Sequence, residues 1–340
     1  MAASMREVAA LAGVSMGTIS NVLNRPDMVS ESTRERVQAA IAQLGFVRND
    51  AARQLRAGQS RMLAVVVLDA RNPFFLDVAA GAESVADSND LLMVLVGSAE
   101  SEERENRQLG LLMEQRVQGI LLSPVGENIP MLDKLDRQGT PVVLLDRGSR
   151  TPGRSSVAVD DVYGGRLAAR HLMDLGHRSL VFVGGPESIR QVRDRRSGAL
   201  SAVAESASTR MSTVWAQSLT IEAGAKAAAR ILDMSDEPPT AAVCANDLLA
   251  LGVLQEYVQR GLRVPDDLAI VGYDDIDYAA GAAVPLTSIA QPRNELGHAA
   301  AELLMEQVDS PAEYEFRQLT FTPTLVVRGS TDHRWRGAEK

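Results

Sequence analysis

Short, β-rich apolar runs that alternate with helical stretches are the feature of this sequence that most constrains its fold. They begin near residue 61, and polar loop residues follow each of them. The runs cover residues 63–68, 92–96, 120–122, 142–145, 180–183, 241–244 and 269–272. Such runs between helices are typical of buried parallel strands. Their two series predict an α/β body of two doubly wound lobes.

The first sixty residues follow a different pattern, which predicts three short helices. Ser4 and Glu7 have the spacing of a capping box, and a glycine turn follows the helix that they begin. A second helix is expected over 16–23, and Ser30 is placed to cap a third over 31–44. Two short helices joined by such a turn are typical of a helix-turn-helix, whose second helix lies in the DNA major groove.

The polar side chains on the face of the second helix are short enough to let the helix approach base edges. Asn21 can bond adenine through two hydrogen bonds, Met16 can contact a thymine methyl group, and Gly17 offers only backbone. The recognition residues predicted from this face are Ser15, Met16, Gly17, Thr18, Ser20 and Asn21. The alternative is an ordinary three-helix cap whose polar face meets only solvent.

The charge distribution favours DNA at one end of the chain. The whole chain has a formal net charge of −9, but residues 1–60 contain seven arginines and five acids. This segment therefore has a net charge of +2, which leaves a net charge of −11 for the rest of the chain. Because phosphate contacts need cationic side chains, the asymmetry predicts DNA binding by the head and repulsion elsewhere.

Several other classes of protein do not fit the sequence. The single cysteine, Cys244, excludes an internal disulfide, and its apolar run predicts a buried thiol rather than a nucleophile. The four histidines lack metal-ligand spacing, so we expect no metal and no cofactor. No apolar run could span a bilayer, and residues 1–12 do not resemble an export signal, which predicts a cytoplasmic protein without membrane contact.

Polar side chains follow the predicted strands, and ligands of doubly wound sheets bind at that edge. Phe74 and Phe75 could cover an apolar ligand face or could equally lie in the core, and for Phe75 the core is favoured. The effector-binding residues predicted from this rule are Asn72, Phe74, Asp146, Gln191, Arg195, Asn246, Asp274 and Gln291. The pair at 146–147 could equally fix its own loop, and residues 191–198 could be a solvated basic helix. Taken together, the set is typical of a site for a polyol.

The head resembles the LacI/GalR (lactose-repressor) family of bacterial regulators. The matching motifs are Glu7-Val8-Ala9, Ala12-Gly13-Val14-Ser15, Thr18-Ile19-Ser20, Val22-Leu23-Asn24, Val29-Ser30, Thr33-Arg34, Asn49 and Ala51-Ala52-Arg53-Gln54-Leu55. The resemblance implies a hinge helix that folds on operator DNA, with Leu55 inserted into the minor groove to bend the duplex. Simple linker packing is the alternative for Leu55.

The resemblance also implies further contacts and a fold for the body. It adds to the DNA-binding set Ser4, Asn24, Ser30, Thr33, Asn49, Ala52 and Leu55. Arg195, Asn246, Asp274 and Gln291 match effector-contacting positions in a periplasmic-binding-protein-like body, whose three crossovers would lie near 157–160, 289–291 and 319–324. This sequence departs from the family at Arg48, at Gly17 and at Leu219, which stands where many members stack an aromatic ring on the effector.

The predicted organisation is therefore a small all-α head and an α/β body. The head covers 1–48, the hinge 49–60, the body 61–330 and a tail 331–340, and the tail has no heptads for a tetramerising coiled coil. The first lobe comprises about 61–158 and 290–319, and the second about 159–289 and 320–330. Closure of these lobes is the expected two-state element.

The predicted function is a repressor that binds operator DNA as a homodimer and responds to a carbohydrate-like effector. A dimer is expected because two heads that read a pseudo-palindrome double the contacts with DNA. Three alternatives stay open: control by a purine corepressor or a protein partner, a sugar-binding module without DNA, and an enzyme. No phosphate-binding loop or nucleophile elbow supports the enzyme.

Overall fold

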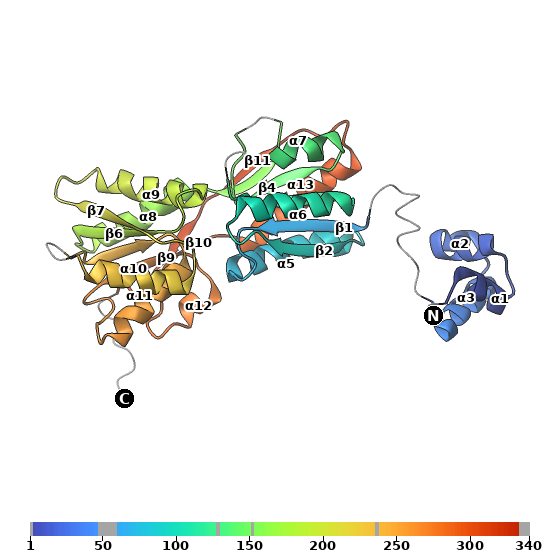
Figure 1. The fold of residues 1–340 in the computed structure, drawn as a ribbon, viewed down its shortest axis with the longest axis horizontal. Coiled ribbons are helices and arrows are strands. Elements are labelled where there is room, and N and C mark those ends of the chain that lie inside the picture. Colours follow the sequence, from blue (N-terminus) through green and yellow to red (C-terminus); the bar gives the residue numbers. More distant parts are fainter. Residues whose placement is uncertain (1–2, 47–59, 127–129, 151–152, 235–237, 333–340) are drawn as a thin grey trace. The chain divides into compact units, whose positions relative to one another are not determined.

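The computed structural model describes residues 3–46, 60–126, 130–150, 153–234 and 238–332. Residues 1–60 and 61–340 form two compact units, and we describe each by itself. The first unit is the small helical head, and the second contains two α/β lobes (Figure 1). Among the described residues, we find no helix with the length and hydropathy needed to cross a bilayer.

The head contains the three helices that the sequence predicts, with a short 3₁₀ turn between the second and the third. Its elements are α1 (Met5–Ala12), α2 (Met16–Asn24), η1 (Pro26–Met28) and α3 (Glu31–Leu44). The capping box of Ser4 and Glu7 is formed, and Gly13 ends α1 in the left-handed conformation. Apolar side chains from all three helices, among them Val8, Ile19 and Val37, build one core.

One capping prediction is wrong. Ser30 precedes α3, but its side chain makes no capping hydrogen bond to the backbone. Its hydroxyl instead pairs with the hydroxyls of Ser32, at 3.4 Å, and Thr33, at 3.0 Å. Neighbouring hydroxyl groups in the sequence Ser30-Glu31-Ser32-Thr33 therefore compete with the backbone for this side chain.

The first lobe is built on a six-stranded sheet in the order β11-β5-β4-β3-β1-β2, and all its pairings are parallel. The strands are β1 (Met62–Val67), β2 (Leu92–Gly97), β3 (Gly119–Leu122), β4 (Val142–Leu145), β5 (Ser156–Val159) and β11 (Gln318–Phe321). Alternate residues of β1 enter two different cores: Val65 lies in one and Val66 in the other.

The second lobe repeats this plan with the order β12-β10-β9-β8-β6-β7. Its strands are β6 (Ser179–Gly184), β7 (Arg210–Trp215), β8 (Ala241–Cys244), β9 (Ala269–Asp274), β10 (Thr287–Ala290) and β12 (Thr324–Val326). All pairings are parallel except that of β12 with β10, which is antiparallel. The sequence did not predict β7, an edge strand in which polar and apolar residues alternate irregularly.

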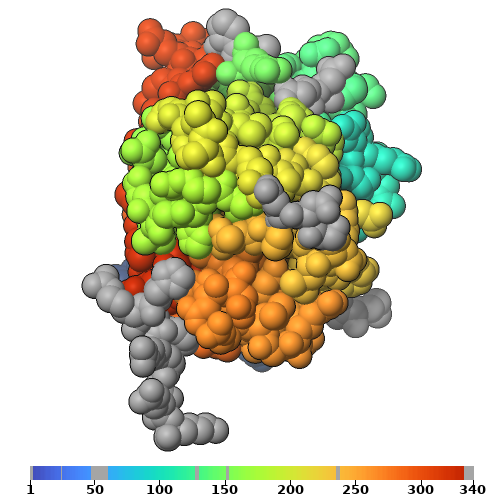
Figure 2. All heavy atoms as spheres, turned by 90° about the vertical axis from the view of Figure 1, so that its left-hand side faces the viewer, coloured from blue at the N-terminus to red at the C-terminus, as the bar shows by residue number. Residues whose placement is uncertain are grey.

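Helices cover both faces of each sheet, as doubly wound folds require (Figure 1). In the first lobe they are α5 (Pro73–Ser88), α6 (Glu102–Glu114), α7 (Pro130–Arg137) and α13 (Arg293–Asp309). In the second they are α8 (Asp161–Asp174), α9 (Arg190–Val203), α10 (Ile221–Leu232), α11 (Asp247–Gln259) and the short α12 (Asp277–Ala280). The end of this lobe presents one continuous surface, yellow-green above orange (Figure 2).

The chain passes between the lobes three times. It leaves the first sheet after β5 to enter α8, returns from β10 into α13, and leaves β11 for β12. These passages lie in the three segments where the sequence resemblance placed crossovers. The predicted fold class, an all-α head with a two-lobed α/β body, is therefore confirmed.

Candidate functional site

The carboxyl ends of the strands of both lobes face each other, and most of the predicted effector residues follow them. Asn72 follows β1 and Asp146 follows β4 in the first lobe, while Asn246 follows β8 and Asp274 ends β9 in the second. Both lobes thus direct polar side chains into the space between them, which is where such sheets bind ligands.

Arg195 of α9 occupies the centre of this site and is 5% exposed. Its Nε donates to Asp161 Oδ1 at 2.8 Å and its Nη1 to the Ala245 carbonyl at 2.7 Å. Its Nη1 also lies 3.5 Å from Asp274 Oδ1, and the centre of the Tyr273 ring lies 3.7 Å from the guanidinium carbon. Protein groups therefore engage this cation from several sides.

Gln191, one turn before Arg195 on α9, joins the two lobes. Its Nε2 donates to the backbone carbonyl of Asp146 at 2.8 Å and to Asp146 Oδ2 at 3.0 Å. The second carboxylate oxygen of Asp146 and the amide oxygen of Gln191 are both buried without a hydrogen-bond partner. Buried polar atoms are normally satisfied, so these two acceptors mark a place where a ligand's donors would be stabilised.

Asp274 links the second lobe to two amides. Its Oδ1 accepts from Gln291 Nε2 at 2.8 Å, and its Oδ2 lies 3.5 Å from Asn72 Nδ2, across the lobes. The amide oxygen of Gln291 is buried and has no partner. Asn72 also caps α5 by accepting from the Phe74 N–H, which fixes its orientation.

Burial raises the pKa values of the carboxyl groups in the cluster. Burial, together with the nearby carboxylate of Asp161, raises the pKa of Asp146 to about 8. Burial also raises the pKa of Asp274 to about 6, although Arg195 opposes the shift. The pKa of Asp161 is likewise raised by burial against the effect of Arg195. The site therefore holds more carboxyl groups than one guanidinium neutralises.

Three residues at the rim, Asn246, Leu219 and Glu100, form a chain of hydrogen bonds that passes from one lobe to the other. Asn246 uses its Oδ1 to cap α11, and its Nδ2 donates to the Leu219 carbonyl at 3.2 Å. The N–H of Leu219 donates to Glu100 Oε1 of the first lobe at 3.2 Å. Asn246 thus holds the loop of Leu219, and both polar ends of its amide are engaged within the protein.

Phe74 is 2% exposed and packs edge-to-face on Phe75, with ring centroids 4.9 Å apart. It belongs to the main hydrophobic core in this conformation, as Phe75 does. Arg147 donates to the Gly126 carbonyl, so it bonds the loop that follows β3 rather than its own loop. Arg193 donates to two backbone carbonyls of the preceding loop, whereas Arg195 bonds Asp161 within the cluster.

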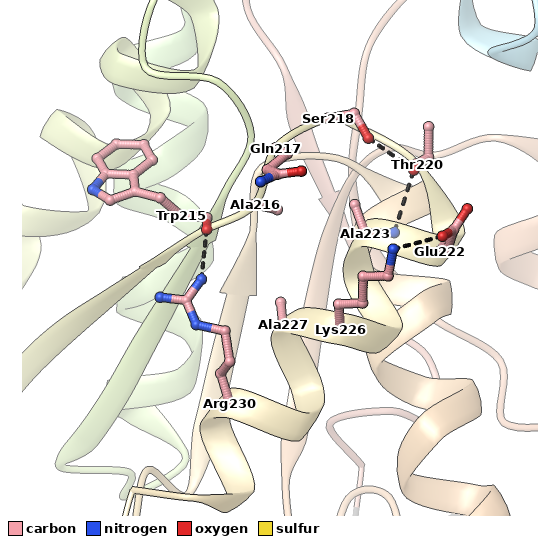
Figure 3. Close-up of a pocket in the computed structure, with 10 residues that line it drawn as sticks. All are labelled: Trp215, Ala216, Gln217, Ser218, Thr220, Glu222, Ala223, Lys226, Ala227 and Arg230. Atoms are coloured by element: carbon pink, nitrogen blue, oxygen red, sulfur yellow. Dashed lines mark hydrogen bonds and ion pairs between the residues drawn. The ribbon is translucent and has the colours of Figure 1, made fainter.

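Two cavities bear on the choice of site. A cavity of about 460 Å³ lies on the second lobe between the end of β7 and α10 (Figure 3). Most of its polar side chains bond one another or the backbone, as Lys226 does to Glu222 and Arg230 to the Trp215 carbonyl. A cavity of about 210 Å³ is lined by both lobes and by Asp161 and Gln191. We favour the smaller one, because Gln191, the predicted effector residue that lines it, has a buried amide oxygen without a hydrogen-bond partner.

The head displays the predicted recognition residues on α2. Met16 is 47% exposed, Asn21 is exposed, and Ile19 and Val22 face the core. Ser15 caps α2 by accepting from the Thr18 N–H at 3.1 Å, and the two hydroxyls lie 2.9 Å apart. The serines predicted to contact DNA stand before helices: Ser4 before α1, Ser15 before α2 and Ser30 before α3. Such positions suit phosphate contacts.

The remaining predicted DNA contacts divide into two groups. Gly17 and Ser20 lie on α2, Asn24 is its last residue, and Thr33 lies in the first turn of α3. Asn49, Ala52 and Leu55 lie outside the described residues, as does Arg48. Their roles stay predictions.

The sequence analysis missed three residues of the interlobe cluster: Asp161, Tyr273 and Glu100. Asp161 follows β5 by two residues, and Glu100 follows β2 by three. The rule that polar residues after strands face the cleft would have found both, had β5 been predicted and the loop after β2 been inspected. Tyr273 directly follows the predicted run 269–272 and lies within β9, so no rule singled it out.

Two family models match this chain. Residues 4–49 match the model described as bacterial regulatory proteins, lacI family, and residues 169–331 match the periplasmic binding protein-like domain. A curated relative, the HTH-type transcriptional repressor PurR of Photobacterium profundum, is 33% identical over 331 residues. The alignment covers 96% of this chain and 98% of that protein.

Solved structures extend the likeness to the whole chain. The transcriptional regulator CelR in complex with cellobiose is 31% identical, with a TM-score of 0.69, and the match covers 96% of this chain and 99% of that one. The Lac repressor dimer bound to operator and the anti-inducer ONPF is 28% identical, with a TM-score of 0.84 and coverage of 97% and 99%. The similarity in sequence and in fold to these regulators includes both the head and the body and covers nearly the full length of the chain. The chain therefore belongs to the LacI family of bacterial transcriptional regulators.

Proposed function

We propose that this regulator is a repressor whose operator affinity changes when a small carbohydrate-like effector binds between the two lobes. The observation that carries the proposal is the set of buried polar contacts between lobes, in which Gln191 bonds Asp146 and Asn72 approaches Asp274. CelR, a similar structure, is a complex with cellobiose. The proposed site residues include six of the interlobe cluster: Asn72, Asp146, Gln191, Arg195, Asp274 and Gln291. Leu219 and Asn246 lie at the rim, and Phe74 packs in the adjoining core in this conformation.

The proposed mechanism is a change in lobe closure. Three crossovers act as hinges, and an effector that bonds to both lobes favours one arrangement over the other. In a homodimer that arrangement sets how the two heads meet the half-sites of a pseudo-palindromic operator. We infer binding without chemical turnover, and a location in the cytoplasm, where the operator DNA is.

The proposed DNA contacts divide by chemistry. The side chains of Met16 and Asn21 contact base edges, and the helix N-termini at Ser4, Ser15 and Ser30 contact phosphates. Leu55 inserts into the minor groove. The Lac repressor dimer, the similar structure with operator bound, supports the partner class.

The test is fluorescence anisotropy of the full-length protein on labelled DNA from the region upstream of its own gene, at fixed salt. Sugars, sugar phosphates and purines are added in turn. Release by a sugar identifies an inducer and supports the proposal. Tightening by a purine identifies a corepressor and contradicts the carbohydrate assignment. Failure to bind any upstream DNA overturns the proposed operator.

Two variants separate the sites. Asn21→Ala is expected to weaken operator binding by roughly ten- to a hundredfold, because a base contact is lost, without changing effector affinity. Asp274→Asn is expected to leave operator binding unchanged and to abolish the effector response. The matched control is Asp87→Asn, which alters an exposed carboxylate of α5. A wild-type response in Asp274→Asn would remove Asp274 from the site.

A further inference from the structure

The groove between β7 and α10 is a second cavity, and it lies outside the interlobe cluster (Figure 3). The end of β7 and the loop 216–220 form one wall, and α10 forms the other. Ala223 and Ala227 are the buried lining residues of α10, and their methyl groups leave the space open. The volume of about 460 Å³ lies in the range of known small-molecule sites. The groove is therefore large enough to hold a compact metabolite.

Arg230 of α10 is held across one end of this groove. Its Nη1 donates to the backbone carbonyl of Trp215, the last residue of β7, at 2.8 Å. The indole ring of Trp215 points away from the groove, so the arginine meets only its backbone there (Figure 3). Within the described part of the chain this is the hydrogen bond that the guanidinium makes, so most of its five N–H donors remain available. An arginine fixed in this way presents a planar set of donors that matches the oxygens of a phosphate or carboxylate.

Lys226, one turn before Arg230 on α10, supplies a second cation to the groove. Its Nζ lies 2.6 Å from Glu222 Oε1, but both side chains are more than 70% exposed. Exposed ion pairs of this kind contribute little to stability, so an anion can share Lys226 with Glu222 at small cost. The charged residues that line the groove are thus two cations and one acid, and their sum favours an anionic ligand.

The loop wall offers neutral polar groups opposite these cations. Gln217 is exposed at the groove, and its amide can both donate and accept hydrogen bonds. The hydroxyls of Ser218 and Thr220 lie 3.0 Å apart, and the Thr220 hydroxyl also caps α10 by accepting from the Ala223 N–H. Amide and hydroxyl groups of this kind suit the hydroxyls of a ligand. The two walls together therefore fit a molecule with one anionic end and a hydroxylated body.

We propose that the groove between β7 and α10 is a second ligand site, which takes a small hydroxylated metabolite with one phosphate or carboxylate group. The anionic group binds Arg230 and Lys226, and the body lies over the alanines of α10 beside Gln217. Phosphate and carboxylate share the chemistry that an arginine recognises, and the arms of the test distinguish them. The proposal does not depend on which molecule occupies the cleft between the lobes.

A ligand in this groove would act on the lobe interface through the loop 216–220. Two residues after Gln217, the N–H of Leu219 donates to Glu100 Oε1 of the first lobe at 3.2 Å. A ligand that bonds both walls holds the loop against α10 and favours the arrangement in which this bond forms. The expected role of the second site is therefore regulatory.

The experiment measures binding to the full-length protein by isothermal titration calorimetry. The probes are glucose 6-phosphate and glycerol 3-phosphate as phosphates, gluconate and glycerate as carboxylates, and glucose and glycerol as their uncharged partners. We expect at least one anion to bind more tightly than its uncharged partner, and Arg230→Gln to weaken that binding at least about tenfold. Arg260→Gln is the matched control, since Arg260 is an exposed arginine of α11 that pairs within its own helix. It should leave the affinity unchanged.

Two further measurements locate the bound anion. Asp274→Asn, which alters the interlobe cluster, should retain the binding, and hydrogen exchange of residues 215–223 should slow when the anion binds to the wild type but not to Arg230→Gln. The proposal is overturned if no anion binds, if Arg230→Gln binds as the wild type does, if Asp274→Asn abolishes binding, or if residues 215–223 gain no protection. These measurements need neither operator nor effector, so failure of the proposed function would leave them unchanged.

Discussion

At the scale of single residues, the first lobe contains a buried carboxyl group outside the interlobe cluster. Glu105 of α6 is 2% exposed, and one of its oxygens accepts from the Val125 N–H at 2.9 Å. Burial raises its pKa to about 7, and the neighbouring Glu102 adds to the shift. The hydrogen bond is present in either protonation state, but burial disfavours the charged form.

Glu105→Gln is expected to make the protein less sensitive to alkaline pH. The folded-state pKa lies above the unfolded value, so the folded state holds more protons between pH 5 and 8, and its stability falls as pH rises. The glutamine oxygen can still accept from Val125 but does not titrate. Between pH 5 and pH 8, the free energy of unfolding measured in urea should fall on the order of 2 kcal/mol more for the wild type than for the variant. Glu103→Gln, an exposed change on the same helix, should follow the wild type.

At the scale of elements, three helix pairs cross at reciprocal glycines. A Cβ on Gly165 of α8 would lie 1.9 Å from the Arg195 carbonyl, and one on Gly198 of α9 would lie 1.8 Å from the Val162 carbonyl. The other close approaches are made by Gly81 and Gly297 between α5 and α13, and by Gly224 and Gly252 between α10 and α11. Such close contact fixes α9, and with it Arg195, against α8.

Gly165→Ala should therefore damage both stability and the site. The new methyl group meets backbone, so α8 and α9 must separate, and we expect a loss of roughly 1–3 kcal/mol together with weaker effector binding. Gly110→Ala on α6 is the control, because its Cβ meets only Met131 Cε at 3.9 Å. That change should be neutral or stabilise by up to about 1 kcal/mol. Equal behaviour of the two variants in urea unfolding would contradict the packing argument.

Local sequence patterns predicted most helices and strands, whereas features that depend on tertiary contacts were not predicted. The apolar runs of β1 and β4 predicted buried strands, because both faces of the sheet are covered. The edge strand β7 lacks such a run, since one of its sides is open, and it was missed. In the site, Asp274 followed from its position after a strand and from the family resemblance. The pairing of Asp161 with Arg195 depends on the packing of α8 against α9 at Gly165 and Gly198, which no local sequence pattern specifies. Because residues 47–59 lie outside the described part of the chain, the bounds of the hinge stay a prediction.

At the scale of the whole molecule, the first sheet ends in an apolar edge. Leu92 of β2 is 64% exposed, and the rest of the strand is only partly covered. Leu76 of α5, the helix that packs beside β2, is also exposed. Exposed apolar edges favour association, which fits a dimeric regulator.

We expect the protein to sediment as a dimer at micromolar concentration, and Leu92→Lys to shift it toward monomers because a charge is placed on that edge. Leu175→Lys is the control, since Leu175 is also exposed, at the end of α8. Sedimentation velocity over a concentration series measures both variants. If both remain fully dimeric, the interface lies elsewhere on the surface.

The two lobes and the head together make a linkage prediction. If one closure equilibrium serves both ligands, an effector that weakens operator binding by a given factor must be weakened by operator by the same factor, within a usual range of about 5- to 150-fold. Calorimetric titration of the effector into the dimer, with and without saturating operator, measures one factor, and anisotropy measures the other. A scrambled duplex should leave effector affinity unchanged. Unequal factors would mean that a further equilibrium, such as dimer dissociation, carries part of the response, and the Leu92→Lys variant would then exaggerate the difference.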